Sequence, residues 1–232
     1  MKVGIMQPYF FPYIGYWQLM NLVDTYVIFD DVNYINRGWI DRNRIIVNGQ
    51  ITYLNLPVLG KSQNKHINEI NVNKDRKIIS KTIKTIELAY KKSPNFAEVY
   101  PLFTDIMNCP EEKLSLFIKN SFEVMANYLG IKTKFVLSSQ IDIDRNLKGQ
   151  DRILAICKKI GATEYINAIG GMDLYSKSLF KENNINLYFL ESGEIKYKQI
   201  CDEFQPNLSI IDVLMNCSIS EIDGFLNKYT LV

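Results

Sequence analysis

The stretch KVGIMQPYFFPYIGYW, residues 2–17, and the run VDTYVIFDD at residues 23–31 decide the fold of this chain. Residues 2–6 and 26–29 are apolar runs typical of buried strands. Between them lie a loop with two prolines, a glycine and six aromatic rings, and then a short helix. This order predicts a βαβ unit, and ligands of open α/β sheets bind outside the carboxyl ends of such strands.

The last hundred residues alternate between strand and helix patterns. We expect strands at 133–137, 164–168 and 185–190, separated by helices at about 151–160 and 172–182. This rhythm predicts a parallel sheet with crossover helices. The fold class is therefore α/β: a Rossmann-like, mostly parallel sheet with flanking helices, plus a β-hairpin and a helical insertion.

The hairpin and the insertion come from the middle of the chain. Asn48-Gly49 between alternating apolar runs is a strong hairpin signal. We expect a further short strand at residues 67–72. Helical patterns fill the insertion at about 74–130, with Asn73 as the expected cap of its first helix and Pro110 at the start of its last. Two short helices are expected in 209–232, and 1–232 is expected to form a single domain.

Composition excludes several classes of function. The chain has 232 residues, 22% of them charged, and a net charge of +2, so it has no concentrated basic face for nucleic acid. No run of apolar residues is long enough to span a membrane. The chain leads directly into a strand at residue 2, without the regions that make up a signal peptide, so we expect a cytoplasmic protein. Four widely spaced cysteines form no CxxC, and one histidine cannot build a multi-histidine metal site. Magnesium stays open, because carboxylates and substrate phosphates suffice for it.

The aromatic loop is the first candidate site. Tyrosine rings beside prolines can stack on a sugar or base and donate hydrogen bonds from their tips. Gln7, Tyr9, Tyr13 and Tyr16 are the candidate substrate-binding residues. Three neighbours, Phe10, Phe11 and Trp17, are expected in the core.

Asp30 and Asp31, at the end of the second strand, are candidate catalytic residues. A carboxylate there can hold a sugar hydroxyl or act as a general base, although an aspartate that stabilises a local turn fits the same position. His66 is the third candidate base, because the usual pKa of histidine is near neutral. A surface histidine without a role is the alternative.

Arginines and glycines supply the other candidates. Arg37 and Arg42, with Asn43, suit an anionic ligand such as a nucleotide diphosphate, because guanidinium groups bind phosphate bidentately. Surface ion pairs are the alternative. Asn167 with Gly170 and Gly171 lies between a strand and a helix, where glycine lets the backbone approach a ligand closely. This motif is neither GxGxxG nor a P-loop.

Taken in order, several motifs resemble the WbqC-like protein family over essentially the whole chain. They are MQPYFFPYIGYW at 6–17, FDDV at 29–32, Arg42-Asn43, GAT at 161–163 with YIN at 165–167, Gly170-Gly171 with Tyr175, and FQPNLSIID at 204–212. The resemblance implies a protein of bacterial O-antigen and surface-polysaccharide gene clusters. It implies a glycine or aminoacyl transferase that acts on an amino sugar, and it brings no catalytic residues with it.

Three functions remain open. The first is an amide-forming transferase with a nucleotide-linked amino sugar as acceptor and an activated amino acid or acyl group as donor. The second is an ATP-using enzyme, because Tyr13-Ile14-Gly15-Tyr16 looks like the HxGH region of nucleotidyltransferases with tyrosines in place of both histidines. The third is a non-catalytic sugar-binding or scaffold protein of a polysaccharide assembly. The sequence does not indicate an oligomeric state.

Overall fold

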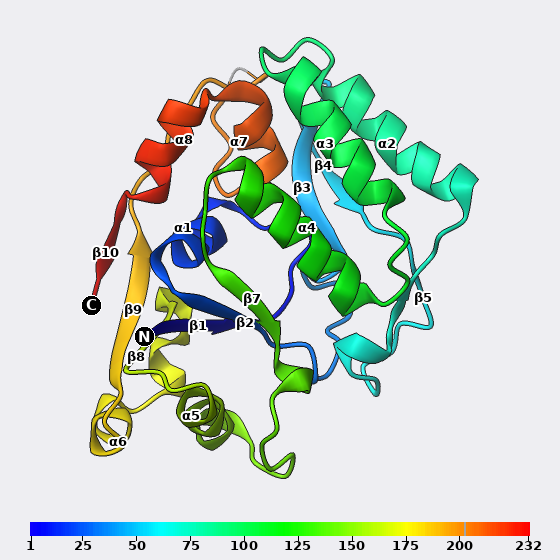
Figure 1. The fold of residues 1–232 in the computed structure, drawn as a ribbon. Helices are drawn as coiled ribbons and strands as arrows, with labels where there is room; N and C mark the ends of the chain where they lie inside the picture. The colour runs from blue at the N-terminus through cyan, green and yellow to red at the C-terminus, as the bar shows by residue number, and fades with distance from the viewer. Residues whose placement is uncertain (202) are drawn as a thin grey trace.

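The computed structural model describes residues 1–201 and 203–232 and is built around a sheet of six strands (Figure 1). The sheet has the order β10-β9-β8-β1-β2-β7. Its strands are β1 (Lys2–Met6), β2 (Thr25–Ile28), β7 (Lys134–Leu137), β8 (Glu164–Ala168), β9 (Asn186–Ser192) and β10 (Tyr229–Leu231). All pair in parallel except β10, which runs antiparallel to β9. The predicted α/β fold class is confirmed.

The strand order creates a switch point beside β1. From β1 the chain moves outward through β2 to β7, and then returns to place β8 and β9 on the other side of β1. Gly4 of β1 accordingly pairs with Tyr26 on one side and Ile166 on the other. The connections that leave β1 and β8 diverge there, which opens a crevice at the carboxyl ends of these two strands.

Helices cover both faces of the sheet (Figure 1). One face packs under α1 (Ile14–Leu22), α4 (Leu114–Tyr128), α7 (Ile210–Asn216) and α8 (Ile219–Leu226), and the other under α5 (Gly149–Lys159) and α6 (Lys177–Glu182). Trp17, Tyr26 and Phe122 are fully buried in the first core, and Tyr165 and Phe180 in the second. The two layers hold the ends of β1 and β8 rigidly.

The predicted hairpin is present as β3 (Arg42–Val47) and β4 (Gln50–Asn55). Asn48 and Gly49 both have positive φ, 50° and 76°, as a type I′ turn requires. Next to it, β5 (Val58–Leu59) pairs with β6 (Asn71–Val72). The helices α2 (Arg76–Tyr90) and α3 (Phe96–Asn108) follow, and α2 packs against both strands of the first hairpin.

Two predictions for the middle of the chain are wrong. The strand expected at 67–72 is a 3₁₀ turn, η1 (Ile67–Glu69), followed by the two residues of β6. The last helix of the insertion begins at Leu114, not at Pro110. The preceding residues stay extended because they pair with β6: the Val72 amide donates to the Glu112 carbonyl at 2.7 Å.

Three further boundaries differ from the predictions. Asp75 caps α2 in place of Asn73, since its carboxylate accepts from the amides of Lys77 and Ile78. The helix expected at 172–182 is split into a 3₁₀ segment, η3 (Ile169–Leu174), and α6, which Ser176 caps. The last strand, β10, is too short to show a period in the sequence and was not expected.

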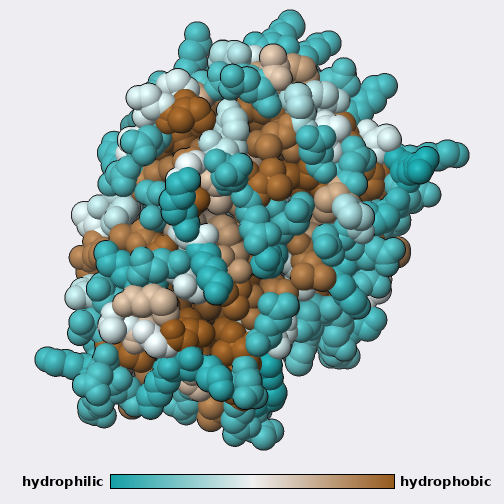
Figure 2. Space-filling model, viewed as in Figure 1, coloured by the Kyte–Doolittle hydropathy of each residue, from teal (hydrophilic) through white to brown (hydrophobic). Residues whose placement is uncertain are grey.

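The surface seen in Figure 2 is mixed, with hydrophobic residues showing between hydrophilic ones near the middle of the face. Of the helices in residues 1–201 and 203–232, none is both long and apolar enough to cross a membrane. A short 3₁₀ turn, η2 (Ser138–Gln140), follows β7 and is the remaining element.

Candidate functional site

A cleft of about 920 Å³ opens at the carboxyl ends of β1 and β8, at the switch point of the sheet. Its walls come from the aromatic loop, the start of α1, strand β3, the glycine turn after β8 and the end of β9. Eight of the predicted site residues line it: Gln7, Tyr9, Tyr13, Tyr16, Asn43, Asn167, Gly170 and Gly171. The volume is at the upper end of the usual range for small-molecule sites.

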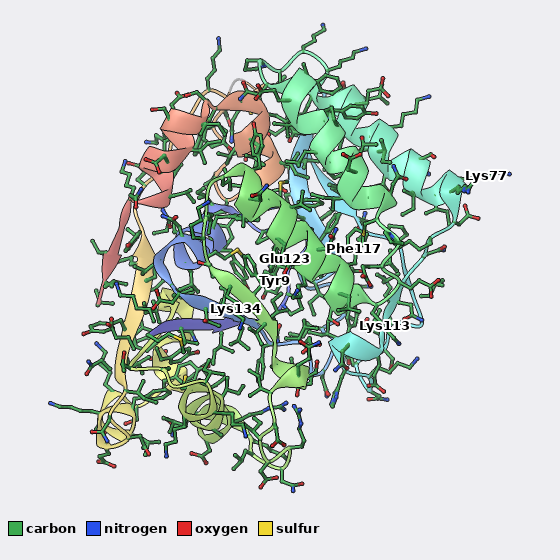
Figure 3. All side chains as sticks on the ribbon, viewed as in Figure 1. Tyr9, Lys77, Lys113, Phe117, Glu123 and Lys134 are labelled. Carbon is green, nitrogen blue, oxygen red and sulfur yellow. The ribbon has the colours of Figure 1, made fainter. Side chains whose placement is uncertain are left out.

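Tyrosines form one wall of the cleft. Tyr9 and Tyr16 stack with ring centroids 4.9 Å apart and planes 23° apart, and Tyr13 meets Tyr16 edge-on at 5.9 Å. Burial raises the pKa of Tyr13 and raises that of Tyr16 well above its usual value, so both phenols stay neutral at physiological pH. They are therefore fixed hydrogen-bond donors on an apolar surface. Figure 3 places Tyr9 close to the middle of the view, whereas Lys77 projects from the outer end of α2.

The aromatic loop is held by hydrogen bonds from distant parts of the chain. Phe11 has a positive φ of 43°, a conformation that few residues with a side chain adopt. The Asn43 amide nitrogen donates to the carbonyls of Phe10 and Phe11, at 3.1 and 2.8 Å, and the Ser209 hydroxyl donates to that of Phe11 at 2.9 Å. Asn43 thus uses its donors to shape the loop. As expected, Phe10, Phe11 and Trp17 are in the core.

The glycine turn after β8 brings backbone close to the cleft. The Asn167 amide nitrogen donates to the Tyr165 hydroxyl, and its oxygen accepts from the Ala168 amide, both at 2.7 Å. A Cβ on Gly171 would lie 3.2 Å from the Asn167 amide nitrogen, closer than ordinary van der Waals contact. Glycine at 171 is therefore what allows the turn to fold over Asn167.

The predicted catalytic aspartates, Asp30 and Asp31, lie outside the lining of the cleft. Both are buried, and their carboxylates are bonded to other residues of the chain. Asp30 accepts from the amide and hydroxyl of Ser139, each at 2.9 Å. Asp31 pairs with Arg145 and with Arg152, and the Arg152 contact measures 2.5 Å. These bonds tie the end of β2 to the end of β7 and to α5, so they stabilise the sheet beside the cleft.

Three other predicted residues also lie outside the cleft lining. Arg42 donates from Nε to the Gly38 carbonyl at 3.0 Å and also to the carbonyl of Arg37. Its guanidinium stacks 4.4 Å from the ring of Tyr53. Arg37 and His66 are exposed. The structure does not bring these three together with the tyrosine wall.

Among the lining residues that were not predicted, six carry polar side-chain groups: Trp39, Arg44, Tyr175, Glu191, Ser192 and Asn207. Glu191 and Ser192 directly follow the predicted strand at 185–190, so they mark the carboxyl end of a strand that neighbours β8. That position is a signal that could have identified them. Arg44 directly precedes the predicted hairpin and lies in β3, but its proximity to the loop depends on how the hairpin docks.

The metal-ligating side chains and the buried thiols bear on the chemistry available to the described part of the chain. No group of three or more His, Cys, Asp or Glu is placed to hold a metal ion there. Burial raises the pKa of Cys157 and of Cys217 to about 12. Since the thiolate is the reactive form, neither residue is suited to act as a nucleophile.

Comparison with known proteins agrees with the geometry at the level of the family. The model of the WbqC-like protein family matches residues 7–223. The chain is 29% identical over 219 residues to the uncharacterized protein Rv1507c of Mycobacterium tuberculosis. This alignment covers 93% of each of the two chains. No solved structure matches the chain.

Proposed function

The chain belongs to the WbqC-like protein family, and from this premise we propose that it is an amide-forming transferase. It attaches a glycyl, other aminoacyl or acyl group to the amine of a nucleotide-linked amino sugar, in the assembly of a bacterial surface polysaccharide such as O-antigen. The single observation that carries this proposal is the cleft at the switch point, because its wall of tyrosines suits a sugar.

The size and the polar groups of the cleft fit this substrate. About 920 Å³ is enough for a nucleotide sugar and exceeds what a monosaccharide alone requires. The Gln7 side chain lines the cleft and has no hydrogen-bond partner among residues 1–201 and 203–232, so it can bind a sugar hydroxyl. Gly170 and Gly171 line the cleft, and their backbone N–H groups would stabilise the oxyanion that forms during acyl transfer.

A thermal-shift screen of the full chain tests the proposal. Nucleotide-linked amino sugars should raise the melting temperature, because a ligand that binds only the folded state stabilises it. Incubation of the bound sugar with an activated donor, either an acyl thioester or an aminoacyl adenylate, should then produce an amide that mass spectrometry detects. Tyr16→Ala should lose the shift, whereas Lys77→Ala, at the outer end of α2, should keep it. Stabilisation without any product would instead favour a sugar-binding or scaffold protein.

An ATP-using enzyme is the second candidate. It is favoured by the position of Tyr13 and Tyr16, which lie at the start of α1 and line the cleft, where nucleotidyltransferases contact ATP. Stabilisation by ATP with magnesium, followed by release of pyrophosphate, would replace the transferase proposal with this one. Stabilisation by amino-sugar nucleotides and not by ATP would exclude it.

A further inference from the structure

The cleft carries two charged side chains, Arg44 and Glu191, among otherwise uncharged lining residues. Neither has an ion-pair partner in the described part of the chain. Arg44 donates from Nη2 to the carbonyls of Pro206 and Asn207, both at 3.3 Å, and its Nε is buried without a partner. The backbone of Glu191 pairs with Thr230 of β10, but its carboxylate accepts no hydrogen bond from any described residue. Arg44 is half-buried and Glu191 is exposed, so both remain accessible to a ligand that supplies the opposite charges.

Arg44 is placed to bind an anionic group. It projects from β3, and its guanidinium carbon lies 5.6 Å from the centre of the Trp39 ring. Stacking orients the planar guanidinium group, and Nη1, which donates to no described residue, stays available. The N–H groups of Nη1 can donate charge-assisted hydrogen bonds to a phosphate, which is the anionic group of a nucleotide or sugar phosphate.

Glu191 is placed beside the glycine turn. Strand β9 pairs with β8 up to Leu190, opposite Ala168, so Glu191 is the next residue beyond the last pair of the parallel ladder. The turn that contains Gly170 and Gly171 begins at the same level of the sheet. A carboxylate at this position can accept a charge-assisted hydrogen bond from a ligand amine.

We propose that the cleft selects an amino sugar with a free amine and a phosphate, the amine bound by Glu191 and the phosphate by Arg44. This inference rests on the proposed function and deepens it, because it identifies which residues recognise the two charged groups of the acceptor. An amino acid also carries both charges, but the cleft of about 920 Å³ is too large for it to be a complementary ligand.

The experiment compares ligands that differ at a single group. Glucosamine 1-phosphate, glucose 1-phosphate and N-acetylglucosamine 1-phosphate, and the three corresponding UDP-sugars, are titrated into the full chain by calorimetry. The wild-type protein should bind the free amine about tenfold or more tightly than the hydroxyl or acetamide analogue, as expected for a hydrogen bond to a charged group. Glu191→Gln should abolish this preference. The matched control is Glu194→Gln, which changes an exposed glutamate that pairs with Lys196 outside the cleft.

The phosphate contact has its own variant. Arg44→Gln should weaken all of these ligands alike, by about tenfold or more, and should reduce the salt dependence of binding. Arg44→Lys should keep part of the affinity, because it retains the positive charge. A loss that follows the charge at position 44 in this way would come from the lost phosphate contact and not from a folding defect. Arg76→Gln, on the exposed first turn of α2, is the control.

The outcomes separate this inference from the proposed function. Equal binding of amine and hydroxyl sugars, or an amine preference that survives Glu191→Gln, overturns the inference and leaves the transferase proposal standing. Binding of a stable glycyl-adenylate analogue in place of every amino sugar would mean that the cleft holds the donor, which also overturns the inference. No binding of any sugar phosphate or nucleotide sugar overturns both.

Discussion

Gly15 controls the shape of the tyrosine wall at the level of a single residue. A Cβ at this position would lie 2.5 Å from Cε2 of the Tyr13 ring, so the ring must move if the glycine is replaced. Gly15 is also in the first turn of α1, where alanine by itself would favour the helix. Packing against Tyr13 therefore explains glycine here better than helix propensity does.

We expect Gly15→Ala to lower ligand affinity by displacing Tyr13, with any gain in helix propensity offset by the clash. The control is Gly224→Ala in α8, where a Cβ meets no described atom within 4 Å. Gly224→Ala should stabilise the protein by about 0.5–1 kcal/mol and leave binding unchanged. Thermal unfolding and ligand titration of both variants give the comparison. An unaltered affinity in Gly15→Ala would show that Tyr13 does not contact the ligand.

Asn43 acts on the cleft through the backbone of the aromatic loop. Asn43→Ala would leave the buried carbonyls of Phe10 and Phe11 without this donor, at a cost of about 1–3 kcal/mol. Loss of ligand affinity should accompany the loss of stability, because the loop that carries Tyr9 and Tyr13 is released. Chemical denaturation measures the first effect and calorimetry the second. Asn55→Ala, on the exposed face of β4, should change neither by a comparable amount.

At the scale of elements, α2 depends on a side-chain cap. Asp75 satisfies the amides of Lys77 and Ile78, which no residue inside the helix can reach. Asp75→Ala should therefore lower the free energy of unfolding by about 1 kcal/mol. Asp105→Ala, an exposed aspartate within α3, is the control and should change it little or raise it. Equal effects would mean that the cap contributes nothing and that α2 is held by packing alone.

The same element shows how side chains from distant positions meet. Tyr90, the last residue of α2, donates from its hydroxyl to Asp212 of α7 at 2.7 Å, and Tyr197 donates to the other carboxylate oxygen at 2.8 Å. Burial raises the pKa of Asp212, and the two phenols partly oppose that rise by bonding to the charged form. This buried group joins α2 to α7 and to the segment that runs toward Asn207 at the cleft.

At the scale of the whole molecule, we propose that residues 1–232 form one domain. The core that contains Tyr26 and Ile166 of the sheet is continuous with Ile86 of α2 and Phe103 of α3. Helices that share a core with the sheet should unfold together with it. Denaturation curves followed by far-UV and near-UV circular dichroism should therefore coincide. Two separate transitions would show that the helical segment at about 74–130 is an independent unit.

Alkaline pH should destabilise the protein because buried tyrosines cannot ionise in the folded state. Burial raises the pKa of Tyr16, Tyr26 and Tyr165 well above the usual value of 10. Above about pH 10 the unfolded chain loses these protons and the folded chain keeps them, so the free energy of unfolding falls as pH rises. Below pH 10 this contribution is fully present and these groups produce no pH dependence.

Melting temperatures measured across pH 7–12, with tyrosinate absorbance recorded in parallel, check this expectation; the range brackets the usual tyrosine pKa of about 10. Tyr26→Phe is the informative variant, because the Tyr26 hydroxyl is buried without a partner in the described residues and its removal should not cost stability. The variant should lose less stability than the wild type above pH 10. A melting temperature that stays constant to pH 12 would contradict the prediction.

Much of the fold was predictable because its signals are local. Strand patterns at 2–6 and 164–168, the Asn48-Gly49 turn and the glycines with positive φ that end α4 and α5, Gly130 and Gly161, depend on residues a few positions apart. Errors occurred where distant pairing overrode a local preference. Pro110 can begin a helix, but the residues after it pair with β6 and stay extended.

The sequence by itself determined the α/β class, the family and the location of a cleft at the end of β1, because all three follow from contiguous motifs. Only the tertiary structure decided which polar residues line that cleft. Asp31 and Arg152 are 121 positions apart and Asn43 and Phe11 are 32 apart, yet each pair is in contact. Strand order brings β8 beside β1 and β9 beside β8, and this placed Glu191 at the cleft and Asp31 outside it. Such contacts depend on the arrangement of whole elements, which no pattern of neighbouring residues encodes.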